Sequence, residues 1–484
     1  MGRKWRISVL FFATLGKKAY FHSLIIKPIL FTMKNTKKWV AILLLLCVGS
    51  GLSAQPRPME EKDETYNHRM EWFGKAKLGI FIHWGIYAVR GVSESWSFFN
   101  GYLPYEEYMK QQSGFKAEKY KPEEWVRLIK ESGAQYTVIT TKHHDGFALW
   151  DTKAGLLSAK KTSAAKRDLL TPFTEEVRRQ GLRLGLYYSL LDWSRDDYPN
   201  KTKTTKRYNI KDNPARWQSF CTFNFAQLKE LNSAYKPDLY WFDGDWEQSA
   251  EDWNSKGIVE LLRTPNPDVI INSRIQGYGD YATPEQGVPV VRPNDKFWEL
   301  CYTMNDSWGY QPTDTNYKTP QMLLRSFVDC LCMGGNMLLD IGPKADGTIP
   351  PEQVKILKEF GRWTSKHKEA IYETRAGIPA EHFHGGYTTL NREGNILYLY
   401  LPNRPNGPIE LKGICNTVHR AWVVGNGTML NPKVYNKLYW SSVPGIVYID
   451  VPEECLDEQI TVVAVLLDGP VKLYRGEGQV ISVN

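Results

Sequence analysis

Between residues 78 and 342, short runs of β-branched and aromatic residues alternate with amphipathic stretches. Apolar runs that are bounded by turn residues and followed by helical periodicity are typical of parallel strands joined by crossover helices. Helix starts are indicated by Pro122, which precedes two glutamates, and by Pro351. The pattern predicts strands at residues 78–84, 136–142, 182–189, 238–242, 269–273, 297–302 and 337–341.

Seven such strands over this length predict an α/β fold, a (β/α)₈-like TIM barrel in which one strand is weak or missing. The periodicity alone is also compatible with a doubly wound sheet. After Tyr372 the helical signals fade, and alternating runs such as residues 396–401 and 460–467 lie between turn residues. We therefore expect a catalytic barrel domain over residues 55–372 and a C-terminal all-β sandwich domain over residues 373–484.

The charge of the chain is distributed unevenly. The whole chain has a formal net charge of +8, with 61 Lys and Arg against 53 Asp and Glu, yet residues 1–54 contain nine basic residues and no acidic one. Without that segment, 52 basic residues face 53 acidic ones, and the net charge is −1. A nucleic-acid partner is therefore not expected.

Residues 1–54 have the features of a signal peptide, with Met33 as an alternative start. Three lysines precede the apolar run 39–48, small residues follow it, and a cleavage site lies after Ala54. The apolar run is shorter than the ~18 residues that a membrane-spanning helix needs. We expect a periplasmic or secreted protein without a stable membrane span.

Seven cysteines are present, and Cys47 lies in the signal segment. Lipid anchoring through Cys47 is the less favoured alternative, because Leu46 stands where a lipobox usually has a small residue. The other six have neither metal-ligand spacing nor a dense disulfide pattern. We expect them to be buried thiols: Cys221, Cys301, Cys330, Cys332, Cys415 and Cys455.

Polar and aromatic residues cluster where the predicted strands end. In a parallel barrel the carboxyl ends of the strands meet at one face, and that face holds the active site. Aromatic rings pack against the apolar faces of sugars, and paired carboxylates hydrolyse glycosidic bonds, so the cluster is typical of a sugar pocket. Its members are His83-Trp84, His143-His144-Asp145, Tyr187-Tyr188, the run 241–246 and Ser273-Arg274.

Several members of this cluster also have simpler explanations. His83 alone is typical of a core histidine that is satisfied by hydrogen bonds. A metal site at His143, His144 and Asp145 is disfavoured, because adjacent residues on a strand point to opposite faces. Asp243 is harder to explain structurally, since burying a carboxylate after an apolar strand is costly unless it has a use.

Ten strings of the sequence, in order and at suitable spacing over residues 72–375, resemble those of the α-L-fucosidases, a family of retaining glycoside hydrolases. The resemblance is more specific than any single motif. The strings are LGIFIHWG (78–85), TTKHHDGFALWD (140–151), KRDLL (166–170), LGLYYSLLDW (184–193), KPDLYWFDG (236–244), NSR (272–274), GDYATPEQ (279–286), WELCYTMNDSWGY (298–310), GGNMLLDIGPKADGTIPPEQ (334–353) and EAIYETR (369–375).

The resemblance implies an exo-acting enzyme that removes terminal α-L-fucosyl residues from an oligosaccharide or glycoconjugate by double displacement, without a cofactor or metal. It implies that Asp243 is the nucleophile and that Glu285 is the general acid/base. Glu299 resembles the acid/base proposed for animal-type members and stays the alternative, being otherwise counted among the substrate-binding residues. The other substrate-binding residues implied are His83, Trp96, His143, His144, Tyr187, Trp241 and Arg274.

The chain departs from the family pattern after the first strand. Many members have Glu-Trp-Tyr there, whereas aligning this chain on Trp96 puts Ser95 at the glutamate position, with Glu94 one residue away. Contacts to the ring hydroxyls are therefore expected to differ, and an L-galactoside or a substituted fucoside is an alternative substrate. A catalytically silent glycan-binding protein is the alternative from another class, but the presence of both Asp243 and Glu285 argues against it.

Overall fold

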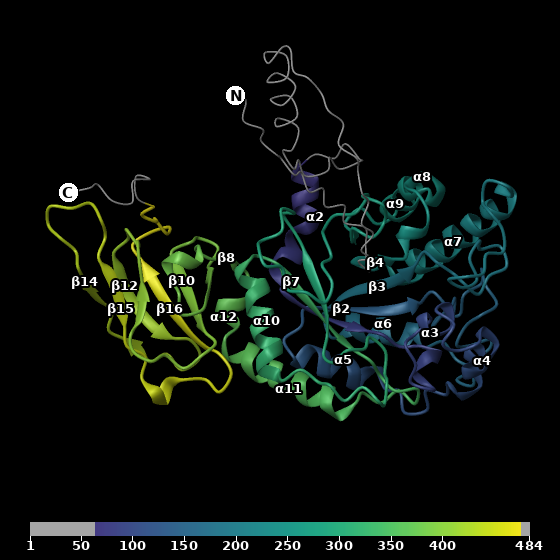
Figure 1. Ribbon diagram of the computed structural model, residues 1–484, viewed down its shortest axis with the longest axis horizontal. Coiled ribbons are helices and arrows are strands. Elements are labelled where there is room, and N and C mark those ends of the chain that lie inside the picture. The colour runs from purple at the N-terminus through teal and green to yellow at the C-terminus, as the bar shows by residue number, and fades with distance from the viewer. Residues whose placement is uncertain (1–62, 476–484) are drawn as a thin grey trace, which may run out of the picture. The chain divides into compact units, whose positions relative to one another are not determined.

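The computed structural model describes residues 63–475 of the chain (Figure 1). The predicted signal peptide, with Met33 and Cys47, lies outside the described residues and stays a prediction. Within residues 63–475, no helix combines the length and the apolar character needed to cross a membrane.

Seven parallel strands form one sheet, in the order β5-β4-β3-β2-β1-β7-β6. From β1 to β5 each strand neighbours the next one in sequence, β6 neighbours β7, and β7 returns to β1, which is the order of a barrel and not of a doubly wound sheet. The predicted strands and barrel are thus confirmed. The strands are β1 (Leu78–Ile82), β2 (Tyr136–Lys142), β3 (Arg183–Ser189), β4 (Leu239–Asp243), β5 (Ile270–Ile271), β6 (Glu299–Thr303) and β7 (Asn336–Ile341).

The place between β5 and β6 is filled by residues 281–285, which we call the closing segment. It makes single parallel bridges, from Tyr281 to Asn272 of the β5 side and from Ala282 and Glu285 to the β6 side. The amide of Cys301 donates to the carbonyl of Pro284 at 3.1 Å. Proline has no amide to return such a bond, so a regular ladder cannot form here. The closing segment is the weak eighth strand that the sequence predicts.

Helices surround the sheet (Figure 1). As predicted, α5 begins at Pro122 and α11 at Pro351, where the missing amide of proline costs nothing. The helices are α2 (Asp63–Ala76), α3 (Trp96–Phe99), α4 (Tyr105–Met109), α5 (Pro122–Glu131), α6 (Leu170–Arg179), α7 (Pro214–Tyr235), α8 (Ala250–Trp253), α9 (Ser255–Arg263), α10 (Pro320–Cys332), α11 (Pro351–Lys366) and α12 (Lys368–Ile371), with 3₁₀ turns η1 (Ile86–Ala88), η2 (Lys110–Gly114), η3 (Asp245–Glu247), η4 (Ala380–His382) and η5 (Glu453–Cys455).

Antiparallel sheets follow the barrel, as predicted. One has six strands in the order β13-β12-β16-β10-β9-β8, and the other has three in the order β11-β15-β14. Their strands are β8 (Arg375–Ala376), β9 (Tyr387–Leu390), β10 (Ile396–Leu401), β11 (Ile409–Leu411), β12 (Val418–Val423), β13 (Met429–Leu430), β14 (Lys433–Tyr435), β15 (Ile446–Ile449) and β16 (Thr461–Leu467).

The six-stranded sheet is buried on both faces. Along β10, Leu397 and Leu399 belong to the core of the C-terminal domain, whereas Tyr398 and Tyr400 belong to the core that the barrel helices share. Successive side chains of a strand point to opposite faces, so one sheet serves two cores. The indole of Trp363 on α11 also donates to the carbonyl of Ile460 at 2.9 Å, which joins the two domains directly.

The six described cysteines form no disulfide. Cys301, Cys330 and Cys455 are buried, as expected, whereas Cys221 and Cys332 are half-buried and Cys415 is exposed. The expectation was wrong for Cys415 because it lies in the loop between β11 and β12, where its amide bonds to the carbonyl of Lys472 and its side chain faces solvent.

The closing segment is tied to the barrel by Asp280, whose carboxylate is buried. One oxygen accepts from Arg69 at 3.0 Å and the other accepts from Arg263 at 2.6 Å. The second oxygen also accepts from the amide of Ile271 at 2.8 Å. Asp280 thereby connects α2, α9 and β5 to the segment that carries Glu285.

We predict that Asp280→Ala lowers the free energy of unfolding by about 3–5 kcal/mol, because two buried guanidinium groups lose their carboxylate. Urea unfolding followed by circular dichroism measures the change. Glu124→Ala is the control, since it breaks an exposed ion pair with Lys121 (2.9 Å) and should cost less than about 1 kcal/mol. Similar small losses in both variants would contradict the role given to Asp280.

Candidate active site

The carboxylate of Asp243, the last residue of β4, is held by groups from neighbouring strand ends. Its Oδ1 accepts from Nη1 of Arg274 at 3.0 Å, and its Oδ2 accepts from the hydroxyl of Tyr187 at 3.0 Å. Nε2 of His144 lies 3.7 Å from Oδ2. The side chain keeps 13% of its surface exposed, so the carboxylate is oriented and charge-balanced yet reachable.

The guanidinium of Arg274 links Asp243 to Glu285. Its Nη2 donates to Oε2 of Glu285 at 2.8 Å, and its Nε donates to the hydroxyl of Thr283 at 3.2 Å. Its Cζ lies 4.5 Å from the ring centroid of Trp241, a cation–π contact. The two carboxylates bind different Nη atoms, which is compatible with the separation of about 5 Å that retaining glycosidases use.

Glu285 is the more accessible of these two carboxylates, with 39% of its side chain exposed. Its backbone is nevertheless fixed, because Glu285 forms a bridge with Cys301 and the next amide, of Gln286, donates to the carbonyl of Cys301 at 3.0 Å. Residues 281–285 lie between the fifth and sixth predicted strands, and the structure makes them a member of the barrel wall.

Three histidines surround the carboxylate, and each is anchored through Nδ1, which turns Nε2 to the opposite side of its ring. Burial holds the pKa of all three well below the usual value, so the imidazoles are neutral. Neutral Nε2 atoms can bind the hydroxyl groups of a sugar. The anchors are Asp340 Oδ1 for His83 (2.6 Å), Ser95 Oγ for His143 and Ser189 Oγ for His144 (2.6 Å).

His143 and His144 lie on the same side of the sheet edge, with ring centroids 4.2 Å apart. The expectation that they point to opposite faces was wrong, because β2 ends at Lys142 and the alternation of a strand ends with it. Nε2 of His144 is buried and has no hydrogen-bond partner among residues 63–475. Within the same residues, no group of three or more His, Cys, Asp or Glu is arranged to hold a metal ion.

Aromatic rings complete the wall of the site. Trp96, which the resemblance implies to be a substrate-binding residue, packs edge-on against His144, with ring centroids 5.3 Å apart. Two further tryptophans also lie here: Trp308 is 5.0 Å from the ring of His83, and Trp246 is 5.9 Å from that of His144. Trp246 belongs to the strand-end cluster that the sequence predicts, although no role was assigned to it. Trp308 was not singled out, although it too follows the end of a barrel strand.

Glu299 lies below this group, at the amino-terminal end of β6, and is entirely buried. Its Oε1 accepts from the indole of Trp241 at 3.0 Å, and its Oε2 accepts from the hydroxyl of Tyr136, the first residue of β2. Burial raises its pKa to about 7, although these two donors oppose the shift. Glu299 therefore supports Trp241 from below, and the structure brings Glu285, not Glu299, to Arg274.

The departure at Ser95 has a structural consequence. Ser95 binds Nδ1 of His143 from behind, while Glu94 is buried and accepts from the amide of Gly309 at 2.6 Å, beside Trp308. Burial raises the pKa of Glu94 to about 7. The carboxyl group of Glu94 thus lies in this part of the wall, one residue before the position at which many family members have a glutamate.

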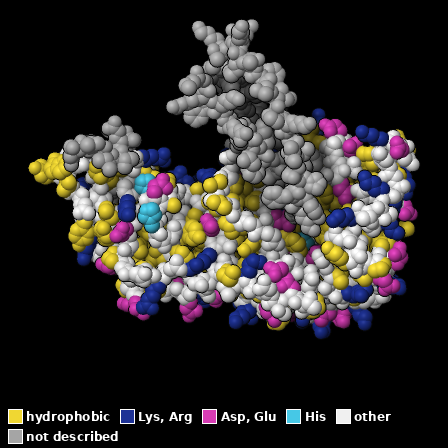
Figure 2. Space-filling model, viewed as in Figure 1, with side chains coloured by type: hydrophobic (Ala, Val, Ile, Leu, Met, Phe, Trp, Pro, Cys, Tyr) yellow, Lys and Arg dark blue, Asp and Glu magenta, His cyan; other side chains and the backbone are white. Residues whose placement is uncertain are grey.

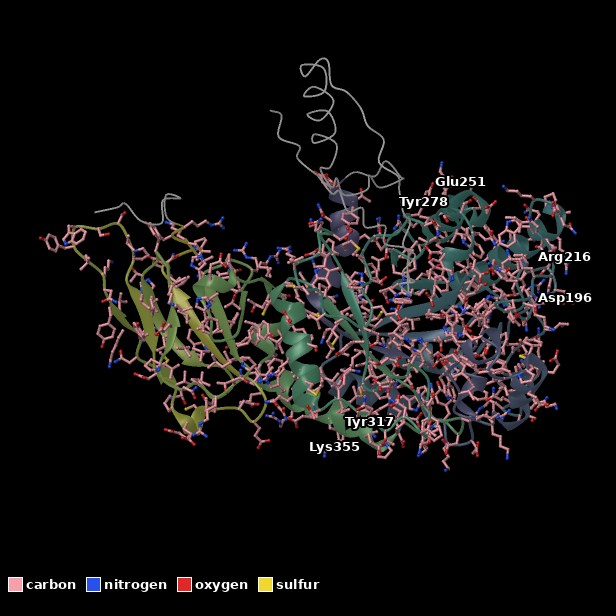
Figure 3. The ribbon with its side chains drawn as sticks, viewed as in Figure 1. Asp196, Arg216, Glu251, Tyr278, Tyr317 and Lys355 are labelled. Atoms are coloured by element: carbon pink, nitrogen blue, oxygen red, sulfur yellow. The ribbon has the colours of Figure 1, made fainter. Side chains whose placement is uncertain are left out.

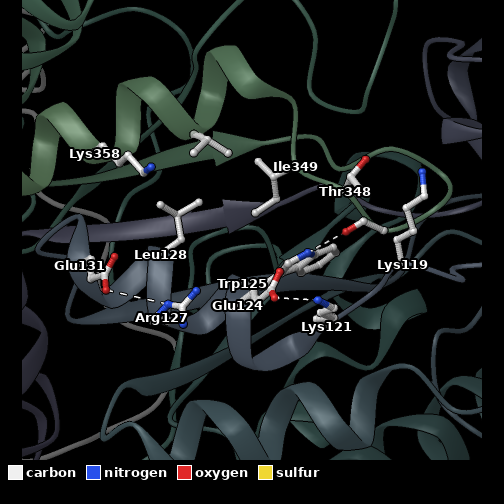
Figure 4. Close-up of a pocket in the computed structure, with 12 residues that line it drawn as sticks. Lys119, Lys121, Glu124, Trp125, Arg127, Leu128, Glu131, Thr348, Ile349 and Lys358 are labelled. Atoms are coloured by element: carbon white, nitrogen blue, oxygen red, sulfur yellow. Dashed lines mark hydrogen bonds and ion pairs between the residues drawn. The ribbon is translucent and has the colours of Figure 1, made fainter.

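A separate hollow of about 330 Å³ lies between α5, α11 and residues 347–349 (Figure 4). Its charged side chains are largely paired, with Lys121 2.9 Å from Glu124 and Arg127 4.0 Å from Glu131. None of the predicted site residues lines it. The chemistry-bearing groups are at the strand ends, so the candidate active site is there.

Comparison with known proteins points to one family. Residues 47–369 match the family model described as Alpha-L-fucosidase. The tissue alpha-L-fucosidase of Mus musculus is 32% identical over 375 residues, which cover 70% of this chain and 80% of that protein. That of Homo sapiens is 31% identical over 371 residues, covering 69% and 77%.

Solved structures agree with the sequence matches. Alpha-L-fucosidase isoenzyme 1 from Paenibacillus thiaminolyticus has a TM-score of 0.76 and 32% identity, covering 84% of this chain and all of that one. An alpha-L-fucosidase from Bacteroides thetaiotaomicron, trapped as a covalent intermediate with 2-fluoro-fucosyl fluoride, has a TM-score of 0.73 and 27% identity, covering 84% and 97%.

The raised pKa of Glu299 predicts a pH-dependent stability. The folded chain holds this proton more tightly than the unfolded chain, so the stabilisation is complete below pH about 4.5 and is lost as the pH rises to about 7. The loss is roughly 3 kcal/mol for this group. Glu299→Gln should reduce the slope accordingly in urea unfolding between pH 4.5 and 7.5.

Glu124→Gln, at an exposed glutamate of α5, is the matched control and should keep the slope of the wild type. Glu299→Gln should be less stable than the wild type at pH 4.5, because its amide oxygen accepts one of the two hydrogen bonds that the carboxyl oxygens of Glu299 accept, and the difference should shrink as the pH rises to 7.5. A wild-type slope in Glu299→Gln would contradict the assignment.

Proposed function

The chain belongs to the α-L-fucosidase family and is a retaining exo-acting glycoside hydrolase, and we propose that Asp243 is its nucleophile and Glu285 its general acid/base. The proposed substrate is a terminal α-L-fucosyl residue of an oligosaccharide or glycoconjugate. One observation carries the proposal: a single guanidinium, that of Arg274, holds both carboxylates at the open end of the barrel.

In the first step an oxygen of Asp243 attacks the anomeric carbon of the fucosyl group. The bond from that carbon to the glycosidic oxygen breaks, and Glu285 gives its proton to the departing oxygen. Tyr187 and Arg274 hold Asp243 at the correct angle for this attack, because each donates to a different carboxylate oxygen. The products are a free alcohol and a fucosyl ester of Asp243.

In the second step a water molecule attacks the same carbon from the face that the leaving group has vacated. Glu285 takes a proton from this water, and Asp243 leaves as a carboxylate, so the sugar keeps its configuration. Once Asp243 is esterified it carries no charge, and Arg274 then faces Glu285 alone.

We assign the sugar hydroxyls to the three neutral histidines and to Trp96. His83, His143 and His144 come from two adjacent strand ends and can each donate or accept one hydrogen bond at Nε2. Trp241 and Glu299 act indirectly, by fixing the plane of Arg274 from below. Glu299 is thus a positioning residue in this mechanism, although the sequence resemblance also offers it as the acid/base.

We predict that Asp243→Ala lowers kcat on 4-nitrophenyl α-L-fucoside by about 10³-fold or more, because no other group supplies the covalent step. Azide can enter the space that the carboxylate leaves, so added azide should yield β-fucosyl azide. Asp450→Ala, at an exposed aspartate of the C-terminal domain, is the control and should keep full activity. Near-normal turnover by Asp243→Ala would overturn the nucleophile assignment.

Glu285→Ala should separate substrates by their leaving groups. The first step should be almost unchanged for a dinitrophenyl fucoside, whose leaving group needs no proton, and about 10²–10⁴-fold slower for a natural fucoside. The second step needs the base in both cases, so fucosyl-enzyme should accumulate, and azide should release it as α-fucosyl azide. Stopped-flow absorbance and product analysis give both readouts.

Two further variants make this test specific. Glu285→Gln keeps an oxygen for Arg274 and should show the same leaving-group dependence, which separates proton transfer from loss of the ion pair. Glu299→Gln should lower activity on both substrates to a similar extent. Leaving-group dependence and α-azide formation in the Glu299 variant, but not in the Glu285 variants, would refute the assignment.

A further inference from the structure

Cys301 lies in the middle of β6, on the inner side of the barrel. Its side chain is entirely buried and belongs to the same inner core as Trp241 and Tyr187. Glu299, two residues earlier on β6, binds the indole of Trp241. Alternate side chains of a strand point to the same face, so β6 directs both Glu299 and Cys301 into the barrel. The candidate active site therefore contacts β6 at two levels.

The thiol of Cys301 joins Arg274 to the closing segment. Nη2 of Arg274 donates to Sγ of Cys301 at 3.7 Å, and Sγ donates to the carbonyl of Pro284 at 3.5 Å. Burial raises the pKa of the thiol well above its usual value, although the charge of Arg274 opposes this shift. The thiol therefore keeps the proton that it donates, while its sulfur accepts from the guanidinium.

The backbone of Cys301 binds the closing segment as well. Its amide donates to the carbonyl of Pro284 at 3.1 Å, and its carbonyl accepts from the amide of Gln286 at 3.0 Å. Together with the thiol, these bonds reach the residues on both sides of Glu285. The place of Cys301 on β6 thus determines where the backbone of Glu285 lies.

The chain between Arg274 and Glu285 does not fix these two side chains by itself. It leaves the site through residues 275–280, where Tyr278 lies at the upper edge of the barrel in Figure 3, and it returns as the closing segment. The side chain of Glu285 is 39% exposed, and ion pairs of exposed groups hold a geometry weakly. The buried thiol supplies a contact with Arg274 that solvent cannot replace.

We propose that Cys301 is a positioning residue, whose thiol holds the guanidinium of Arg274 and the backbone of Glu285 in one fixed arrangement. A neutral thiol fits this place because it adds no third negative charge to a guanidinium that two carboxylates already share. This inference rests on the proposed function and extends it from the two carboxylates to the residue that fixes their relative positions. Cys301 then affects proton transfer by Glu285 and not the binding of the fucosyl group.

The test compares substrates whose leaving groups differ in their need for a proton. Cys301→Ala should lower kcat/KM on a natural fucoside about 10-fold, because a misplaced acid transfers its proton less efficiently. On a dinitrophenyl fucoside the loss should stay within about threefold, since this leaving group needs no proton. The inhibition constant of free fucose should stay within about twofold of the wild type, because the fucosyl contacts are unchanged.

Two further substitutions separate hydrogen bonding from volume. Cys301→Ser keeps one donor and one acceptor and should recover most of the activity on the natural fucoside. Cys301→Val fills the space without either and should behave as Cys301→Ala. Circular dichroism verifies the fold of each variant, and the serine and valine variants carry the comparison where the alanine variant does not fold.

A double-mutant cycle shows whether Cys301 acts through Glu285. In the Glu285→Ala background, Cys301→Ala should lower kcat/KM on the natural fucoside by less than about twofold, because the group that it positions is absent. Cys415→Ala is the matched control, since Cys415 is exposed in the C-terminal domain, at the left of Figure 2. It should behave as the wild type on both fucosides.

Equal losses of Cys301→Ala on the two fucosides, additive losses in the cycle, or no loss at all would overturn the positioning role and leave the proposed function intact. A Glu285→Ala enzyme without leaving-group dependence would instead refute the proposed function.

Discussion

The single positive charge of Arg274 is shared by two carboxylates, those of Asp243 and Glu285, to which we assign opposite tasks. In the mechanism that we propose, Asp243 must be ionised to attack and Glu285 must be protonated to assist departure, so the cation between them cannot favour one without affecting the other. Its plane is set by the ring of Trp241, whose indole nitrogen is bound by Glu299. The reacting groups therefore depend on a column of contacts that reaches down to the amino-terminal end of the barrel.

The irregular eighth position of the barrel makes this arrangement accessible. A regular strand would bury alternate side chains on both faces, whereas the closing segment pairs through single bridges and leaves Glu285 half-exposed at the rim. The buried contacts of Asp280 with Arg69 and Arg263 replace the missing ladder. The side chain of Glu285 is thus accessible to a ligand, while its backbone is fixed in the barrel wall.

Much of this fold could be predicted from the sequence, because both faces of the barrel strands are buried and their apolar runs stand out. The position of Asp243, His83 and Tyr187 at the ends of predicted strands also predicts that they lie in one site. The contacts of Glu299 could not be predicted, since they join strands that are 163 and 58 residues apart in sequence. The shared orientation of His143 and His144 was missed because it depends on where β2 ends.

The double burial of the six-stranded sheet has a consequence for the independence of the two domains. Tyr398 and Tyr400 complete the core beside the barrel helices, while Leu397 and Leu399 of the same strand complete the core of the sandwich. Neither domain can then be exchanged or shed as a module, since separation would uncover an apolar sheet face and invite aggregation. The sandwich and the barrel therefore depend on each other for a dry core, and a substitution on either face of the shared sheet affects the packing of both.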